Sequence, residues 1–134
     1  MMIERISHIG IAVTDIGASI ELFRRLFGKE PGHIEAVPDQ RVRTALFEIG
    51  SSSIELTEAT DASSPIAKFL EKRGEGVHHI SFVVDDIAGE LDRLRGEGFQ
   101  LIDEKPRMGA DGYLVAFLHP KSTNGVLIEI SQKK

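Results

Sequence analysis

Apolar and polar residues alternate in two stretches of the chain that match each other without a gap. HIGIAVTDI at 8–16 aligns with HISFVVDDI at 79–87. Alternation with a period of two is typical of a β-strand. Each stretch leads into a pattern with helical spacing, carried by Ile20, Phe23 and Phe27 in the first half and by Leu91 and Leu94 in the second. The chain therefore contains a repeat whose two copies each begin with a strand followed by a helix.

Each copy continues into a pair of strands. The pairs are expected at 43–50 with 53–58 in the first half, and at 113–120 with 126–131 in the second. A further strand is expected ahead of each pair, at 32–37 and at 100–104.

Between the halves, residues 64–74 combine a Ser-Pro start, an apolar stripe and a glycine stop, which predicts a connecting helix. We expect an α+β fold of two paired βαβββ modules, at about 4–60 and 77–132, within a single domain spanning 1–134. The modules are expected to form a curved, partly open mixed sheet around a metal site.

Composition narrows the kinds of function. The chain has 134 residues, 41% of them hydrophobic, a formal net charge of −5 and no cysteine. Scattered basic residues on an acidic chain argue against nucleic-acid or acidic-membrane partners. Disulfides and thiolate ligands are excluded, so a metal would need imidazole or oxygen ligands. No apolar run approaches the ~20 residues that span a bilayer, and no signal segment is evident. We expect a cytoplasmic protein.

The repeat distinguishes between two neighbouring histidines, His78 and His79. His79 aligns with His8, whereas His78 has no counterpart in the first copy. Adjacent side chains in a strand point to opposite faces, so only one of the two shares a face with the repeat-equivalent position. His79 is therefore the candidate functional residue, and His78 and His33 are expected to be structural.

Two glutamates add to this pattern. Glu55 and Glu129 each lie between apolar residues in equivalent strands, so both carboxylates are expected to point away from the hydrophobic face. Each module thus contributes one histidine and one glutamate. Any one of these residues alone is more often structural or solvated. Four at repeat-equivalent positions favour a site for one divalent ion, with Co²⁺, Zn²⁺, Ni²⁺, Mn²⁺ and Fe²⁺ all compatible.

The chain resembles the vicinal oxygen chelate superfamily, and within it the methylmalonyl-CoA epimerase family. The resemblance is carried by residues 8–16, by SPIAKFLEKRGEGVHHISFVVDDI at 64–87 and by DEKPRMGADGYLVAFLHPKSTNGVLIEISQ at 103–132. It implies paired βαβββ modules, a homodimer, an acyl-CoA substrate, and a metal held by His8, Glu55, His79 and Glu129. Relatives often have glutamine where this chain has Glu55.

The implied reaction inverts the stereocentre of methylmalonyl-CoA by removing the α-proton and returning one to the opposite face. A cation beside the thioester oxygen would stabilise the enolate, and two bases would exchange the proton. By resemblance Glu129 is one base as well as a ligand. The position expected to hold the second base carries Thr44, which cannot serve in that way. Glu48, on the same strand face, is the substitute candidate.

Three basic residues near the implied pocket, Lys105, Arg107 and Lys121, are candidates for binding the coenzyme A phosphates. Scattered surface charge is an equally good interpretation of all three.

Other functions stay open at this point. A glyoxalase-type lactoylglutathione lyase uses the same ligand geometry on a glutathione adduct. An iron dioxygenase would use two histidines and one carboxylate, so a fourth ligand counts against it. A metal-free antibiotic-binding protein of the same fold usually has apolar or small residues at the ligand positions, which this chain does not.

Overall fold

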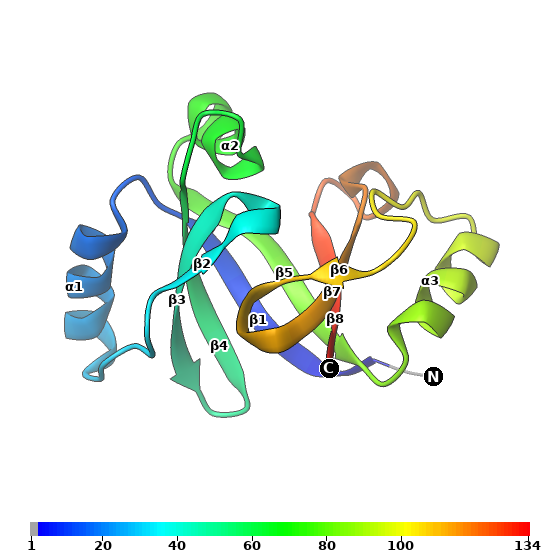
Figure 1. Cartoon of the computed structure of the whole chain (residues 1–134), viewed down its shortest axis with the longest axis horizontal. Helices are drawn as coiled ribbons and strands as arrows, with labels where there is room; N and C mark the ends of the chain where they lie inside the picture. The colour runs from blue at the N-terminus through cyan, green and yellow to red at the C-terminus, as the bar shows by residue number, and fades with distance from the viewer. Residues whose placement is uncertain (1–2) are drawn as a thin grey trace. The chain divides into compact units, whose positions relative to one another are not determined.

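The chain forms two compact units in the computed structural model, which describes residues 3–134. One unit comprises the chain up to His8 together with His79–Lys134, and the other comprises Ile9–His78. Two strands, β1 (Ile3–Ala12) and β5 (Gly76–Val84), each have residues in both units. Figure 1 follows the elements in chain order.

In the unit formed by Ile9–His78, helix α1 (Ile16–Phe27) follows β1. Its first turn is capped by Asp15, whose side chain accepts the Ala18 N–H, and it ends at Gly28 in the left-handed conformation. Strands β2 (Glu35–Val37), β3 (Val42–Ile49) and β4 (Ser52–Ala59) come next, with a short 3₁₀ turn at Pro38–Gln40. Helix α2 (Pro65–Arg73) closes the unit.

The strands of this unit lie in the order β2-β3-β4-β1, with antiparallel pairing from β2 to β4. Helix α1 packs on one face of β3 and β4. The core beneath it consists of Val13, Ile16, Ala45, Phe47 and Leu56.

The second unit repeats this plan. Helix α3 (Ile87–Gly96) follows β5 and is capped by Asp86. Strands β6 (Arg107–Met108), β7 (Tyr113–Leu118) and β8 (Ile128–Lys133) follow, with 3₁₀ turns at Ala110–Gly112 and Pro120–Ser122.

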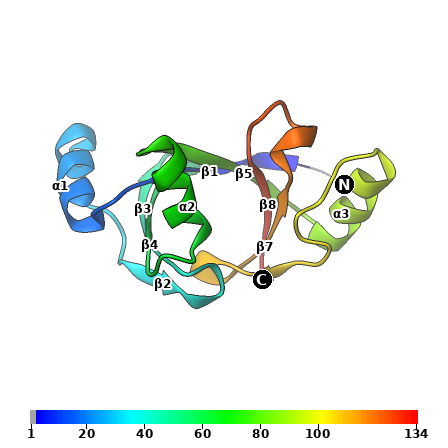
Figure 2. The same cartoon turned by 90° about the horizontal axis from the view of Figure 1, so that it is seen from above.

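The strands of this second unit run in the order β5-β8-β7-β6. β5 pairs with β8 in parallel, and β7 pairs with both β8 and β6 antiparallel. Figure 2 shows α3 from above.

The strands of this unit have one apolar face, which is covered by α3. The core there consists of Val84, Ile87, Leu91, Leu94, Ala116, Leu118 and Ile130. Because strand side chains alternate, Phe117 and Glu129 point to the opposite face. The hydrophobic packing of the helix therefore determines which face of the sheet carries the polar residues.

The predicted α+β fold of two βαβββ modules is confirmed, and the connecting helix lies where expected. That the whole of 1–134 behaves as one domain stays a prediction. No helix among residues 3–134 is long and apolar enough to cross a bilayer.

The strand expected at 100–104 is wrong. Only an isolated bridge joins Leu101 to Leu118, and the short strand of this region is β6, a few residues later. The Asp103 side chain accepts the backbone N–H of Phe117, at 2.8 Å. A side chain thus takes the place of the backbone acceptor that a continuing strand would have supplied.

Candidate metal centre

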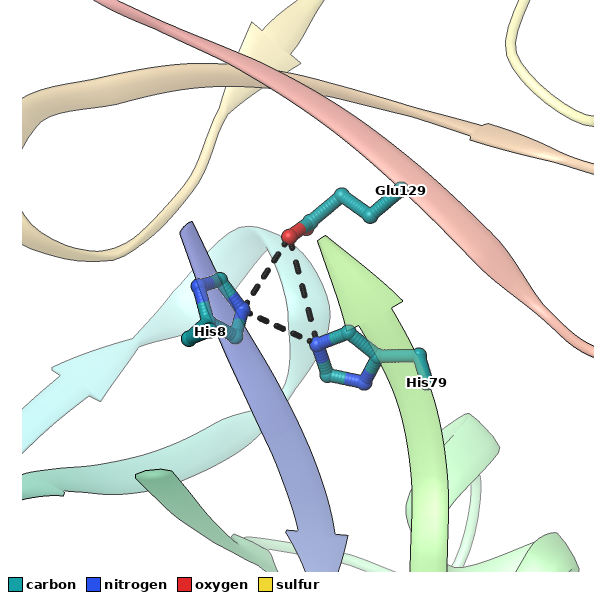
Figure 3. A group of neighbouring side chains, drawn as sticks. All are labelled: His8, His79 and Glu129. Carbon is teal, nitrogen blue, oxygen red and sulfur yellow. Dashed lines mark hydrogen bonds and ion pairs between the residues drawn. The ribbon is translucent and has the colours of Figure 1, made fainter. Parts of the chain in front are cut away.

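Three side chains converge on the polar face of the second unit. Nε2 of His8, on β1, lies 3.1 Å from Nε2 of His79, on β5 (Figure 3). Oε1 of Glu129, on β8, lies 3.2 Å from Nε2 of His8 and 3.9 Å from Nε2 of His79. His79 and Glu129 are buried and His8 is partly buried. Residues from three separate strands thus present three potential ligand atoms to one point.

The imidazole of His8 contacts the side chain of the preceding residue, Ser7. Its Nδ1 lies 3.0 Å from Oγ of Ser7. If Nδ1 carries the proton and donates it to Ser7, Nε2 is left with a free lone pair directed at the cluster. This is the arrangement by which proteins orient a histidine that binds a metal.

Glu129 is ionised in spite of its burial. Burial alone would raise the pKa of Glu129, but the His8 imidazole within hydrogen-bonding distance and the positive charge available at His79 and His8 outweigh it. The pKa therefore lies below the ordinary value of 4.5. Glu129 presents a carboxylate, which is the form that coordinates a cation.

The cluster fits a divalent ion. Oε1 of Glu129 is shielded from water and makes no hydrogen bond of good geometry, which is costly for a buried charged atom without a compensating cation. Donors bound to an ion at about 2.0–2.2 Å lie about 3.0–3.5 Å from one another. Two of the three observed distances fall in that range, and the third is slightly longer. Two imidazoles and one carboxylate suit a transition-metal ion with positions left open.

His78 lies outside the cluster. Its ring packs edge-on against Phe69 of α2, with ring centroids 4.9 Å apart. His33 is exposed, with Nε2 4.0 Å from a Glu35 carboxylate oxygen. His79 thus lies in the cluster and His78 does not, as the repeat alignment predicts, and the ligand role of His79 stays a prediction.

The fourth predicted ligand, Glu55, belongs to the other unit. It lies on β4, opposite Leu46 of β3, and its carboxylate accepts a hydrogen bond from the hydroxyl of Thr57 at 3.2 Å. Glu55, Thr57 and Thr44 are all buried. Its side chain points away from the hydrophobic core, as expected, and its role as a ligand stays a prediction.

The remaining predicted site residues are more exposed. Glu48 is exposed near the end of β3, opposite Ser53, and Lys105 and Lys121 are also exposed. Arg107 is partly buried, and its Nε lies 3.4 Å from Oδ1 of Asp103. Their roles as second base and phosphate contacts stay predictions.

Sequence reasoning missed the residues that surround the cluster. The residue that aligns with Ser7 in the second copy of the repeat is His78, so the repeat does not single out Ser7. Ser81 pairs with Glu129 across β5 and β8, and its hydroxyl donates to Ser131 at 3.3 Å in the buried layer beside Glu129. Phe117 lies opposite Glu129 across β7 and β8. Because side chains alternate along β5, Ser81 lies on the same face as His79, and this spacing could have identified Ser81 from the sequence.

Comparisons with known proteins show the family to which the chain belongs. Residues 7–117 match the model of the Glyoxalase/Bleomycin resistance protein/Dioxygenase superfamily. The chain is 40% identical over 133 residues to the ethylmalonyl-CoA/methylmalonyl-CoA epimerase of Cereibacter sphaeroides, covering 98% of this chain and 99% of that one. It is 33% identical over 129 residues to the human mitochondrial methylmalonyl-CoA epimerase, covering 96% and 73%.

A solved structure is similar as well. The methylmalonyl-CoA epimerase determined in complex with methylmalonyl-CoA and NH₄⁺ superposes with a TM-score of 0.95, at 38% identity, and covers 98% of this chain and 96% of that one. The chain belongs to the glyoxalase/bleomycin resistance protein/dioxygenase superfamily and, within it, to the methylmalonyl-CoA epimerase family.

Proposed function

We propose that this protein is a metal-dependent epimerase that interconverts the stereoisomers of methylmalonyl-CoA. Two observations support the proposal together. Similar proteins over nearly the whole chain are named methylmalonyl-CoA epimerases, and the cluster of His8, His79 and Glu129 has the donors and spacing that suit a divalent ion.

The reaction requires a weakly acidic proton to leave the carbon between a carboxylate and a thioester. A divalent cation held by the cluster would act as a Lewis acid where negative charge develops on the substrate oxygens. Co²⁺, Zn²⁺, Ni²⁺, Mn²⁺ and Fe²⁺ all suit this donor set. His8 and His79 would hold the ion through their Nε2 atoms, with Glu129 as the third ligand and Glu55 as the proposed fourth.

Glu129 would also move a proton. A carboxylate has two oxygens, so Oε1, which lies near the two imidazoles, would bind the cation while the other would exchange a proton with the substrate. The buried position keeps bulk water from competing for that proton. Glu48 is proposed as the base on the opposite face of the substrate.

The coenzyme A phosphates would meet basic side chains. Lys105 and Lys121 are exposed and therefore accessible to a large anionic group. A homodimer and a cytoplasmic location complete the proposal, and sedimentation analysis of the purified protein would test the first of these.

The decisive experiment follows deuterium from heavy water into the α-carbon of methylmalonyl-CoA, with chelated protein and after adding each divalent ion. We expect metal-dependent exchange into both stereoisomers. The hemithioacetal of methylglyoxal and glutathione serves as the competing substrate, because a glyoxalase-type enzyme would isomerise it. Turnover of that adduct without exchange in methylmalonyl-CoA would reject the proposal.

Three variants test the proposed roles of Glu48 and Glu55 in the same assay. Glu48→Gln is expected to suppress exchange into one stereoisomer more than into the other, since a single base serves each face. Glu55→Gln keeps an oxygen donor and is expected to retain metal binding, whereas Glu55→Ala is expected to weaken it. Equal, wild-type exchange in all three variants would remove both residues from the mechanism.

A further inference from the structure

One aromatic side chain connects the metal centre to the rest of its unit. The ring of Phe117 packs edge-on against the imidazole of His79, with centroids 5.7 Å apart and planes at 81°. Such a contact orients a ring as well as burying it. Phe117 is 8% exposed.

Phe117 also lies directly opposite Glu129 in the antiparallel pair of β7 and β8. Its backbone N–H and carbonyl group form hydrogen bonds with Asp103 and Ile102, at 2.8 and 2.9 Å, and so face away from β8. Phe117 and Glu129 are therefore a non-hydrogen-bonded pair, the type in which opposite side chains come closest. The Phe117 ring thus borders two of the three ligand residues of the cluster.

Charged groups also lie close to the Phe117 ring. The guanidinium carbon of Arg107 lies 5.8 Å from the centroid of the Phe117 ring. Nε of Arg107 lies 3.4 Å from one carboxylate oxygen of Asp103, whose second oxygen accepts the Phe117 N–H. The carboxylate of Asp103 therefore contacts both the backbone of Phe117 and the guanidinium group of Arg107 that lies over its ring.

We propose that Asp103 and Arg107 are positioning residues, which hold Phe117 against His79 and so fix the direction of the His79 imidazole at the metal centre. The expected effect of these residues on metal affinity rests on the proposed function. This role differs from the phosphate contact predicted for Arg107 from the sequence. Arg107 acts here through the ring that it covers.

The test compares Arg107→Gln, which removes the cation, with Arg107→Lys, which retains a cation for the ring. Arg95→Gln is the matched control, because Arg95 makes ion pairs with Asp92 and Glu104 of the same unit and has no part in the contacts around Phe117. Phe117→Leu removes the aromatic contact while keeping an apolar side chain. Thermal melting of each metal-free variant measures any general loss of stability.

Two readouts are made on each protein. The first is the NMR shift of the His79 ring protons in the metal-free protein, which depends on the ring current of Phe117. The second is affinity for Co²⁺, measured by titration. Arg107→Gln is expected to change the His79 shifts and weaken Co²⁺ binding about fivefold, the size of one cation–π contact. Phe117→Leu is expected to weaken it about tenfold. Arg107→Lys should restore both readouts toward wild-type values, and Arg95→Gln should alter neither.

The two readouts separate the positioning role from the metal centre. Unchanged His79 shifts in Arg107→Gln, or equal changes in Arg107→Gln and Arg95→Gln, overturn the positioning role. If the wild-type protein binds no Co²⁺, the metal centre of the proposed function is refuted. The spectra of the metal-free proteins then decide alone whether Arg107 holds the ring.

Discussion

Nε2 of His8 and Nε2 of His79 lie 3.1 Å apart, although the two residues are separated by 71 positions in the sequence. Two nitrogen atoms at this distance need a proton or a cation between them. The nearby carboxylate of Glu129 adds negative charge at the same point. The arrangement is therefore most stable when a positive charge is shared by all three groups.

Replacing His79 and replacing His78 should have very different effects on deuterium exchange. His79→Ala is expected to lower metal-dependent deuterium exchange to the rate measured without metal, because a ligand is lost. His78→Ala removes only the packing contact with Phe69 and is expected to retain most of the exchange. Equal losses in the two variants would show that the repeat register is wrong.

Ser7→Ala should weaken the metal site without touching a ligand. Its hydroxyl is the partner of Nδ1 of His8, and loss of such an orienting group lowers metal affinity by about 10–100-fold. Calorimetric titration with Zn²⁺ measures the change. Ser63→Ala is the control, since that hydroxyl donates to Asp61 in the other unit. Equal affinities in both variants would contradict an orienting role for Ser7.

Glu129 should make stability depend on pH in the acid range. Its pKa in the folded protein lies below 4.5, so the stability that it contributes is present above 4.5 and is lost as the pH falls through the folded pKa. In chelated protein, the melting temperature of the wild type is expected to fall more steeply on acidification than that of Glu129→Gln. Parallel curves for the two proteins would show that the carboxylate has no favourable partner in the fold.

Two glycines should respond to alanine in opposite directions. Gly28 ends α1 with a φ of 69°, where a side chain is strained, so Gly28→Ala is expected to destabilise the protein by about 1 kcal/mol. Gly96 is helical, and an added Cβ there meets nothing within 4 Å. Gly96→Ala is expected to stabilise by about 0.4–1 kcal/mol. Urea unfolding measures both changes.

The sequence predicted those features that depend on local pattern. Alternation and helical spacing located the four long strands of the two pairs and all three helices, because burial on one face repeats with the period of the element. The strand predicted at 100–104 was wrong for a non-local reason. The partner of the Phe117 N–H is the Asp103 side chain, and that choice depends on how the segment crosses β7.

Some residues of the candidate site could likewise be predicted from the sequence pattern, and others could not. His79 could be chosen over His78 because a repeat compares two positions that share one environment. Phe117 and Asp103 could not be found, since their contacts with His79, Arg107 and each other form only in the folded unit. Arg107 was recognised as a cation, but its place above an aromatic ring is a property of the folded unit.

The three donors come from β1, β5 and β8, at residues 8, 79 and 129 of a chain of 134. During synthesis, the first two therefore leave the ribosome long before the third. An ion captured before residue 129 is made would lack the carboxylate of Glu129, and would bind weakly and exchange readily. Selection of the proposed metal is thus expected to take place on the completed chain, where the cell's free-ion concentrations decide which cation is loaded.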